Sequence, residues 1–264
     1  MSIYLNKMLL CVLLVLAGGA LLGGCTSVPD LKNIPEASIE DRSAARKKFL
    51  EGRQFLSLKM NAQALESFVD AIKLDPGNAS YYFAAGEVNF SEERLDAAEK
   101  YFKSALQIDP RSKGVSRELG RLYMSKGMWE EAIQNFKQDI EISGTTFPHE
   151  VYNWLALSYY QLNQFDNAER EWLTALNFRD NADIRYNLGI AYKSRKEYDK
   201  ALKSFVAATH LNPEFVSAHF EAAILLYGKQ QWLGARQHFE EVIRFDPKGE
   251  MAILSRKYLN EMVE

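Results

Sequence analysis

The sequence predicts an all-α solenoid of six similar units, on the strength of three recurring positions. Alanine returns every 33 to 36 residues, at Ala64, Ala98, Ala132, Ala168, Ala201 and Ala235. Four residues after each alanine comes a large aromatic: Phe68, Phe102, Phe136, Trp172, Phe205 and Phe239. Twelve residues before each alanine is a small residue: Gly52, Gly86, Gly120, Ala156, Gly189 and Ala223. One unit of about 34 residues cannot bury its own apolar face, so neighbouring units must stack.

Each unit contains two amphipathic helices, as in YYFAAGEVNFSEE followed by LDAAEKYFKSALQI. Apolar residues recur at three and four positions, which is the helical period. The alanine and the aromatic four residues later share one face of the second helix. The small residue lets the two helices approach closely. In four units an Asp-Pro or Asn-Pro step should end the second helix, because the residue before proline is pushed out of the helical region. The prolines of these steps are Pro76, Pro110, Pro213 and Pro247.

The third unit departs from this rhythm. Gly144 stands where the stop proline is expected, and two extra residues precede the next unit. Glycine can end a helix in a left-handed conformation, and Pro148 would prevent the helix from resuming. Phe147 and Pro148 therefore form an insertion between the third and fourth units, which should offset the two halves of the solenoid slightly.

The chain divides into four parts on these patterns. Residues 1–24 are expected to be a signal peptide, 25–43 a tether, 44–247 the six repeats, and 248–264 a capping helix with a charged outer face. The composition, 47% hydrophobic and 25% charged, is that of a folded protein. A net charge of −3 with interspersed signs offers no footprint for nucleic acid.

The N-terminus has the features of a secretory signal. A single lysine, Lys7, precedes the apolar run MLLCVLLVLAGGALL, and small residues precede a polar, proline-containing segment. The run is shorter than the roughly 20 residues that span a bilayer. An uncleaved membrane anchor is the alternative. Both cysteines, Cys11 and Cys25, lie in this region, so the body of the protein has no disulfide framework.

The repeats carry no recognisable catalytic or metal-binding motif. The four histidines are scattered, and no phosphate-binding loop, nucleophile elbow or HExxH motif occurs. The glycines already have packing roles. The sequence therefore predicts a non-enzymatic binding scaffold without a metal, a cofactor or a small-molecule substrate.

The alanine, aromatic, small and proline positions resemble the tetratricopeptide repeat signature over residues 45–247. The resemblance implies a right-handed superhelix of antiparallel helix pairs. Its concave surface would be lined by residues five, nine and twelve of each unit, counted from Ala45, Ala79, Lys113, His149, Ala182 and Val216. The family's carboxylate clamp, a lysine at five with an asparagine at nine, is absent from every unit.

A partner-binding groove is therefore expected on the concave face, rich in apolar and aromatic side chains. It suits an extended or amphipathic peptide segment. Packing between adjacent repeats is the alternative role for part of this face. The candidate residues are Phe49, Phe83, Phe90, Arg117, Arg121, Met124, Asn153, Leu157, Tyr160, Tyr186, Ile190, Phe220 and Tyr227.

The sequence LGGC, which ends at Cys25, resembles the bacterial lipobox. The resemblance implies cleavage before Cys25 and a covalent lipid on that residue. Gly23 is a less usual residue at its position. Thr26 follows the cysteine, in place of the aspartate that retains lipoproteins at the inner membrane, so the resemblance implies a periplasm-facing location on the outer membrane.

The complete arrangement of lipobox, tether and six repeats resembles the type IV pilus secretin pilotins of the PilF and Tgl type. Its most specific local point is Phe147-Pro148, followed by a helix that contains Asn153. The resemblance implies that the protein binds secretin subunits and promotes their outer-membrane localisation and multimerisation for pilus biogenesis and twitching or social motility. The alternative is a scaffold lipoprotein of a polysaccharide export or envelope assembly complex.

Overall fold

The structure, a computed structural model, describes residues 36–143 and 148–262, and these residues form thirteen helices and no strand. The prediction of an all-α repeat solenoid with a final helix is confirmed. The helices are α1 Ile39–Ser57, α2 Asn61–Leu74, α3 Ala79–Ser91, α4 Leu95–Ile108, α5 Val115–Ser125, α6 Trp129–Ser143, α7 Pro148–Gln161, α8 Phe165–Phe178, α9 Ala182–Ser194, α10 Tyr198–Leu211, α11 Val216–Gly228, α12 Trp232–Phe245 and α13 Glu250–Glu261.

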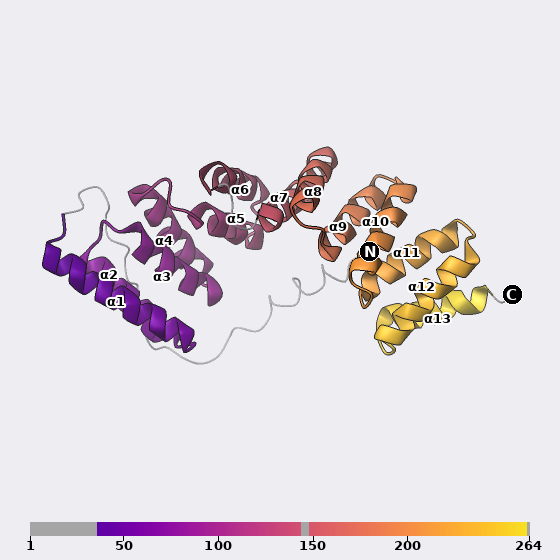
Figure 1. Ribbon diagram of the computed structural model, residues 1–264, viewed down its shortest axis with the longest axis horizontal. Helices are drawn as coiled ribbons and strands as arrows, with labels where there is room; N and C mark the ends of the chain where they lie inside the picture. The colour runs from indigo at the N-terminus through magenta and orange to yellow at the C-terminus, as the bar shows by residue number, and fades with distance from the viewer. Residues whose placement is uncertain (1–35, 144–147, 263–264) are drawn as a thin grey trace, which may run out of the picture.

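The helices pack as six consecutive antiparallel pairs, α1 with α2 through to α11 with α12, and α13 packs on the last pair. The pairs follow one another along an arch (Figure 1). In the arch α3 and α5 lie on the inner side, and α4 and α6 lie on the outer side. Each second helix also contacts the first helix of the following pair, and one core continues from α1 into α11. A second, smaller cluster around Phe239 lies between α11, α12 and α13.

The recurring small and aromatic residues meet inside each pair. Phe68, Phe102, Phe136, Phe205 and Phe239 are completely buried, and Trp172 is almost so. A Cβ atom added to Gly120 would lie 2.5 Å from the ring of Phe136, and one added to Gly86 would lie 2.5 Å from Phe102. Such distances are shorter than normal packing allows, so in these two repeats the aromatic ring leaves room only for a glycine opposite it.

The second helices end where the Asp-Pro and Asn-Pro steps predict. Helices α2 and α4 end at Leu74 and Ile108, followed by Asp75 and Asp109 in non-helical conformations. Helices α10 and α12 end in the same way before Asn212 and Asp246. The proline that follows each of these residues excludes the helical region for the residue before it.

The first helix starts earlier than the sequence analysis expects. Helix α1 begins at Ile39, so residues 39–43, assigned to the tether, are helical. Ser38 caps the helix: its hydroxyl oxygen accepts a hydrogen bond of 3.0 Å from the amide of Asp41. Glu40 and Asp41 in the first turn complement the positive end of the helix dipole. The tether boundary at residue 43 was therefore placed five residues too late.

The capping helix is also less polar than expected. In α13, Ala252 and Ser255 are buried against the preceding pair. On its outer side Ile253 is 61% exposed and Leu254 is 40% exposed. The outer face therefore combines charged residues with two aliphatic ones.

Two polar contacts of the same kind link successive repeats along one edge. Lys126, at the end of α5, forms ion pairs of 2.8 Å with Asp96 and 2.6 Å with Glu99 on α4. Two repeats later Arg195 pairs with Asp166 at 3.1 Å and Glu169 at 2.7 Å. Asp96 and Asp166 are almost fully exposed, so their ion pairs add little stability. The pairs of Lys126 with Glu99 and of Arg195 with Glu169 are largely shielded from solvent and link the repeats more firmly.

A pair of histidines lies inside the last helix pair, between α11 and α12. His219 on α11 is 7% exposed, and its Nε2 lies 2.9 Å from the carbonyl oxygen of Pro213. Nε2 therefore carries the proton, and Nδ1 of His219 accepts a 2.8 Å hydrogen bond from Nδ1 of His238 on α12. Burial lowers the pKa of both rings, to about 4 for His238, where the neighbouring His219 and His210 add repulsion.

We expect this pair to make folding sensitive to mild acid. Because the folded pKa values lie below the usual value, the unfolded chain binds protons first, and stability falls as the pH drops below about 6.5. The loss should reach about 2 kcal/mol by pH 4.5. Chemical denaturation at pH 7 and pH 4.5 measures it. The variant His238→Asn keeps a donor near the Nδ1 position, and its free energy of unfolding should fall less between pH 7 and pH 4.5 than that of the parent. In the control variant His149→Asn the fall should equal that of the parent. An equal loss in His238→Asn and parent would contradict the assignment.

The described part of the chain contains no helix that combines the length and the apolar character needed to cross a bilayer.

Candidate functional site

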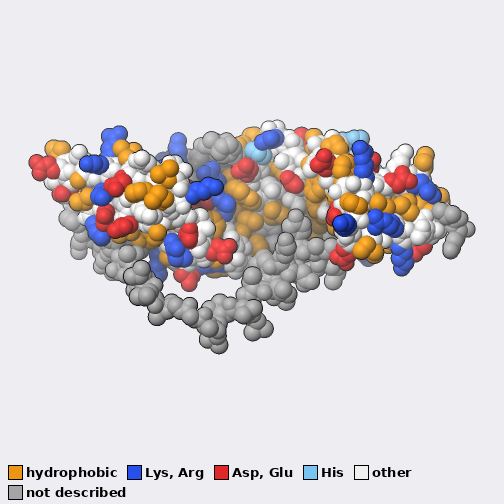
Figure 2. Space-filling model, turned by 90° about the horizontal axis from the view of Figure 1, so that it is seen from below, with side chains coloured by type: hydrophobic (Ala, Val, Ile, Leu, Met, Phe, Trp, Pro, Cys, Tyr) orange, Lys and Arg blue, Asp and Glu red, His pale blue; other side chains and the backbone are white. Residues whose placement is uncertain are grey.

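The candidate groove residues lie on the first helices of the six pairs. All of them are half-buried except Arg121, which is exposed. Viewed from below, hydrophobic side chains gather on the recessed middle of the molecule, with charged side chains around both ends (Figure 2). Their partial burial indicates that one side of each side chain packs on the core and the other side is accessible to a partner.

Most of the aromatic candidates pack on the buried aromatic of their own repeat. The ring of Phe49 lies 5.6 Å from that of Phe68, and the ring of Tyr186 lies 5.6 Å from that of Phe205. The other pairs are Phe83 and Phe90 with Phe102, Tyr160 with Trp172, and Phe220 with Phe239. Met124, Leu157 and Ile190 pack against the same core. These side chains therefore have a structural role in addition to any role in binding.

Arg121 joins three repeats across this face. Its guanidinium carbon lies 5.5 Å from the ring centre of Phe90 and 5.2 Å from that of Trp154. Glu118 holds the guanidinium with a 2.6 Å ion pair. Trp154 in turn stacks on Phe136, with 5.9 Å between ring centres. The result is a flat, amphipathic platform in which a cation lies between two aromatic faces.

Sequence reasoning missed Trp154. It is residue six of its repeat, whereas the expected positions were five, nine and twelve. The sequence does contain an indication of its role, because the neighbouring repeats have polar residues at position six, Glu118 and Asn187, where this repeat has a tryptophan.

Charges of alternating sign continue the platform toward the N-terminal repeats. Arg53 lies 3.9 Å from Glu87, and Arg117 lies 3.5 Å from Glu118. Burial raises the pKa of Glu87, repulsion from Glu118 raises it further, and Arg53 and Arg117 oppose this. Together with Arg121 the cluster carries three positive and two negative groups, so it favours a partner segment with at least one acidic group.

Asn153 has a specific local partner. Its side-chain oxygen accepts a 2.8 Å hydrogen bond from Nε1 of Trp172 and a 3.3 Å hydrogen bond from Nδ2 of Asn187. Trp172 is the one tryptophan among six buried aromatics, and only tryptophan brings a ring N–H into that position. A buried donor requires an acceptor, which Asn153 supplies. This explains why position five holds asparagine in the fourth repeat.

We expect Asn153→Ala to lower the free energy of unfolding by about 1–3 kcal/mol, because it leaves the N–H of Trp172 without an acceptor. The double variant Asn153→Ala with Trp172→Phe removes the N–H as well as its acceptor and places phenylalanine at this position, as in the other five repeats. It should therefore recover part of that loss. Chemical denaturation of the parent, both single variants and the double variant measures the coupling. Additive effects would show that the hydrogen bond is unimportant.

The C-terminal end of the face is closed by α13. The ring of Tyr227 lies 5.3 Å from that of Trp232 and 4.9 Å from that of Tyr258, and its hydroxyl donates to Glu261 at 3.2 Å. Tyr258 stacks on Phe239. Tyr227 therefore packs against the capping helix as well as lying at a groove position.

Two candidate residues lie outside the described residues: Cys25, the predicted lipidation site, and Phe147 of the insertion. Pro148 is the first residue of α7. Proline suits this position because it lacks only a backbone N–H that the first turn leaves unpaired.

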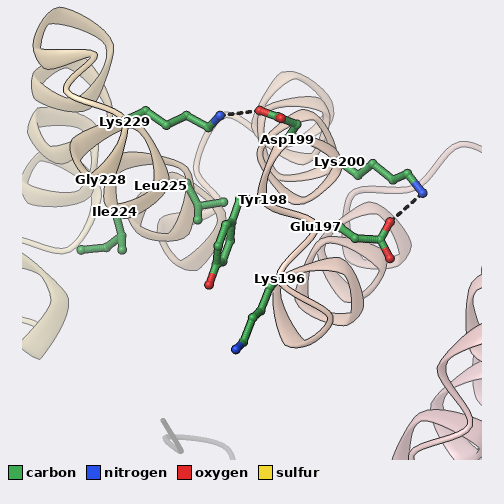
Figure 3. A pocket seen from close by; sticks show the side chains of 9 residues that line it. All are labelled: Lys196, Glu197, Tyr198, Asp199, Lys200, Ile224, Leu225, Gly228 and Lys229. Carbon is green, nitrogen blue, oxygen red and sulfur yellow. Dashed lines mark hydrogen bonds and ion pairs between the residues drawn. The ribbon is translucent and has the colours of Figure 1, made fainter.

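A shallow depression of about 590 Å³ lies on another edge, between the fifth and sixth repeats. Lys196, Tyr198, Lys200, Ile224 and Lys229 are among its lining residues (Figure 3). Two of the lysines are already paired: Lys200 with Glu197, and Lys229 with Asp199. Sequence reasoning did not find this depression, because its residues look like an ordinary solvated edge.

Within residues 36–143 and 148–262, no three His, Cys, Asp or Glu residues are grouped closely enough to hold a metal ion.

The fold and its concave face define the class as a helical-repeat scaffold. Models of the tetratricopeptide repeat match residues 49–113, 89–139, 149–177 and 182–215. The protein is therefore a tetratricopeptide repeat protein, as its repeat signature predicts.

Known proteins resemble the chain over most of its length. Human tetratricopeptide repeat protein 6 is 31% identical over 205 residues, which cover 76% of this chain and 39% of the human protein. The structure of PilF from Pseudomonas aeruginosa superposes with a TM-score of 0.68 at 17% identity, covering 84% of this chain and 99% of PilF. PilW, a type IV pilus biogenesis factor, superposes at 0.66 and 17% identity, covering 78% of this chain and 96% of PilW. At these identities the two structures establish a shared fold.

Proposed function

We propose that the protein is an outer-membrane lipoprotein scaffold, a pilotin, that binds type IV pilus secretin subunits and promotes their localisation and multimerisation. What supports the proposal is the combination of a lipobox-like sequence ending at Cys25 with a repeat stack that spans almost the whole of PilF. The platform of Phe90, Arg121 and Trp154 supplies a surface for an extended or amphipathic segment of the secretin.

The proposed mechanism is non-catalytic. The lipid on Cys25 gives the protein its membrane affinity, at about 0.8 kcal/mol for each buried methylene. The groove holds secretin subunits near the outer membrane and raises their local concentration, which favours their assembly into multimers. The scaffold requires no cofactor or nucleic acid for this role.

Affinity purification of the protein from detergent-solubilised membranes, followed by mass spectrometry, tests the proposal. The pilotin role predicts a secretin as the main specific partner. A polysaccharide export porin or synthase in its place would show that the protein serves a different envelope complex.

Arg121→Glu should weaken partner binding about 30-fold or more without unfolding the protein. Arg121 is exposed and contacts only the half-buried rings of Phe90 and Trp154 and the carboxylate of Glu118, so its replacement leaves the fully buried core intact. Reversal of the charge places a carboxylate beside Glu118 between two aromatic faces. Central arginine and tryptophan residues commonly contribute 2 kcal/mol or more to binding. Titration of the purified secretin partner measures the effect, and Arg111→Glu, an exposed substitution in the loop after α4, serves as the control. Equal affinities of the two variants for the secretin would show that the platform is not part of the binding site.

A further inference from the structure

The outer face of α1 is the one large helix face that the described part of the stack leaves uncovered at its N-terminal end. Helix α1 packs on α2, and no described helix precedes it. In the other five repeats, residues three and ten of the unit are buried, on a first helix that contacts the second helix of the preceding pair. The residues buried at these positions are Tyr81, Val115, Val151, Ile184 and Ala218 at three, and Val88, Leu122, Ser158, Ala191 and Leu225 at ten.

In the first repeat the same positions hold Lys47 and Gln54, both exposed. A polar cap is sufficient to explain these two residues, because an open end of a stack must remain soluble. It does not explain the aliphatic residues on the same side. Leu50 is 58% exposed and Ile39 is 86% exposed, and both lie on the helix face that carries Arg46 and Lys47.

The charge of this region is strongly one-sided. From Arg42 to Lys59 there are six basic residues and one acid, Glu51. Three of the six basic residues form ion pairs: Lys48 with Glu51, Arg42 with Glu36, and Arg53 with Glu87. Two more acids, Glu40 and Asp41, are confined to the first turn. Arg46 and Lys47 form no ion pair within the part of the chain that the structure describes. Over its whole length α1 carries five bases and three acids, whereas α13, at the other end of the stack, carries two of each.

We infer that the outer face of α1 docks on an anionic phospholipid surface, with Arg46 and Lys47 among the lipid headgroups and Leu50 at the acyl boundary. Basic residues interleaved with exposed aliphatic ones are the pattern of a helix that lies in a membrane interface. The position in the chain supports this occupant. Thirteen residues, 26–38, separate Cys25 from α1, and they reach at most about 45 Å when extended. The inference rests on the proposed lipid anchor at Cys25.

Docking would orient the molecule. With α1 against the bilayer, the arch extends away from the membrane, and the platform at Arg121 remains open toward the periplasm. The tether would then limit the distance of the repeat stack from the membrane only while α1 is not docked on the headgroups.

Lipidated protein in vesicles tests the inference through a single fluorescent label. Removal of the signal eliminates Cys11 and acylation blocks Cys25, so Leu50→Cys provides the one reactive thiol. Leu233→Cys, on α12 and 73% exposed, provides the control position. Quenching by brominated lipids is compared in vesicles of phosphatidylglycerol with phosphatidylethanolamine and in vesicles of phosphatidylcholine alone.

The inference predicts strong quenching at position 50 in the anionic vesicles only, and little at position 233. Each basic residue near an anionic surface contributes roughly a fivefold gain in binding. Arg46→Glu with Lys47→Glu removes two such residues and should therefore lower the equilibrium constant for docking at least about 25-fold. Lys203→Glu with Lys257→Glu, which reverses two exposed charges elsewhere, should leave it unchanged.

Equal quenching at both positions, or quenching that does not depend on the headgroup charge, would overturn the inference. So would a label at position 50 that is shielded only after secretin is added, since the face would then bind protein. Flotation of the lipidated protein with the vesicles reports the anchor separately, so a failure of the lipid anchor is distinguishable from a failure of α1 to dock.

Discussion

The proposed lipid anchor predicts that replacement of Cys25 by serine releases the protein from the outer membrane almost completely. The serine hydroxyl does not accept the lipid. Several acyl chains at about 0.8 kcal/mol per methylene supply far more membrane affinity than the basic face of α1. Membrane fractionation measures the distribution, and metabolic labelling with a radioactive fatty acid reports the modification itself.

The same variant separates the two halves of the proposed mechanism. The groove lies on α1 through α11 and does not involve Cys25, so the affinity of the variant for secretin should remain that of the parent. Delivery of secretin to the outer membrane should be lost. A Cys25→Ser protein that stays in the outer membrane and incorporates no fatty acid would show that a segment other than the lipid holds it there.

Replacement of Phe136 by alanine should lower the free energy of unfolding by about 3–5 kcal/mol. Phe136 is completely buried, fills the space opposite Gly120, and supports Trp154. The cavity left by the ring cannot close, because the backbones on both sides are fixed by neighbouring repeats. The platform at Arg121 should also loosen, since Trp154 loses the ring on which it stacks.

Chemical denaturation followed by circular dichroism measures this loss. Leu233→Ala removes a comparably large side chain from a site that is 73% exposed and should change the stability by less than about 0.5 kcal/mol. If Phe136→Ala were no more destabilising than Leu233→Ala, the central packing position assigned to the recurring aromatic would be wrong.

The fold was predictable because its determinants lie close together in the sequence. The pairing of Gly86 with Phe102 involves residues 16 positions apart and recurs in each repeat with a glycine or alanine at the small position. The helix ends at Leu74 and Ile108 follow from the local preference of the residue before proline. The start of α1 was placed too late because the Ser38 cap lies outside the repeat period.

The details of the binding face were less predictable, because they depend on contacts between repeats. The position of Arg121 between Phe90 and Trp154 requires three repeats at a particular angle, which repeat spacing does not specify. Asn153 was selected as a groove residue, whereas its hydrogen bond to Trp172 depends on a ring that differs from phenylalanine in one repeat only. The buried pair of His219 and His238 joins residues that looked scattered in the sequence.

The amount of secretin multimer in the outer membrane of a strain that lacks this gene tests the account most directly. Complementation with the parent protein should restore multimers and surface pili. Complementation with Arg121→Glu should give a correctly anchored protein and few multimers, and Cys25→Ser should give a secretin-binding protein and few multimers at the outer membrane. Normal multimers and pili in the strain without the gene would contradict the pilotin role.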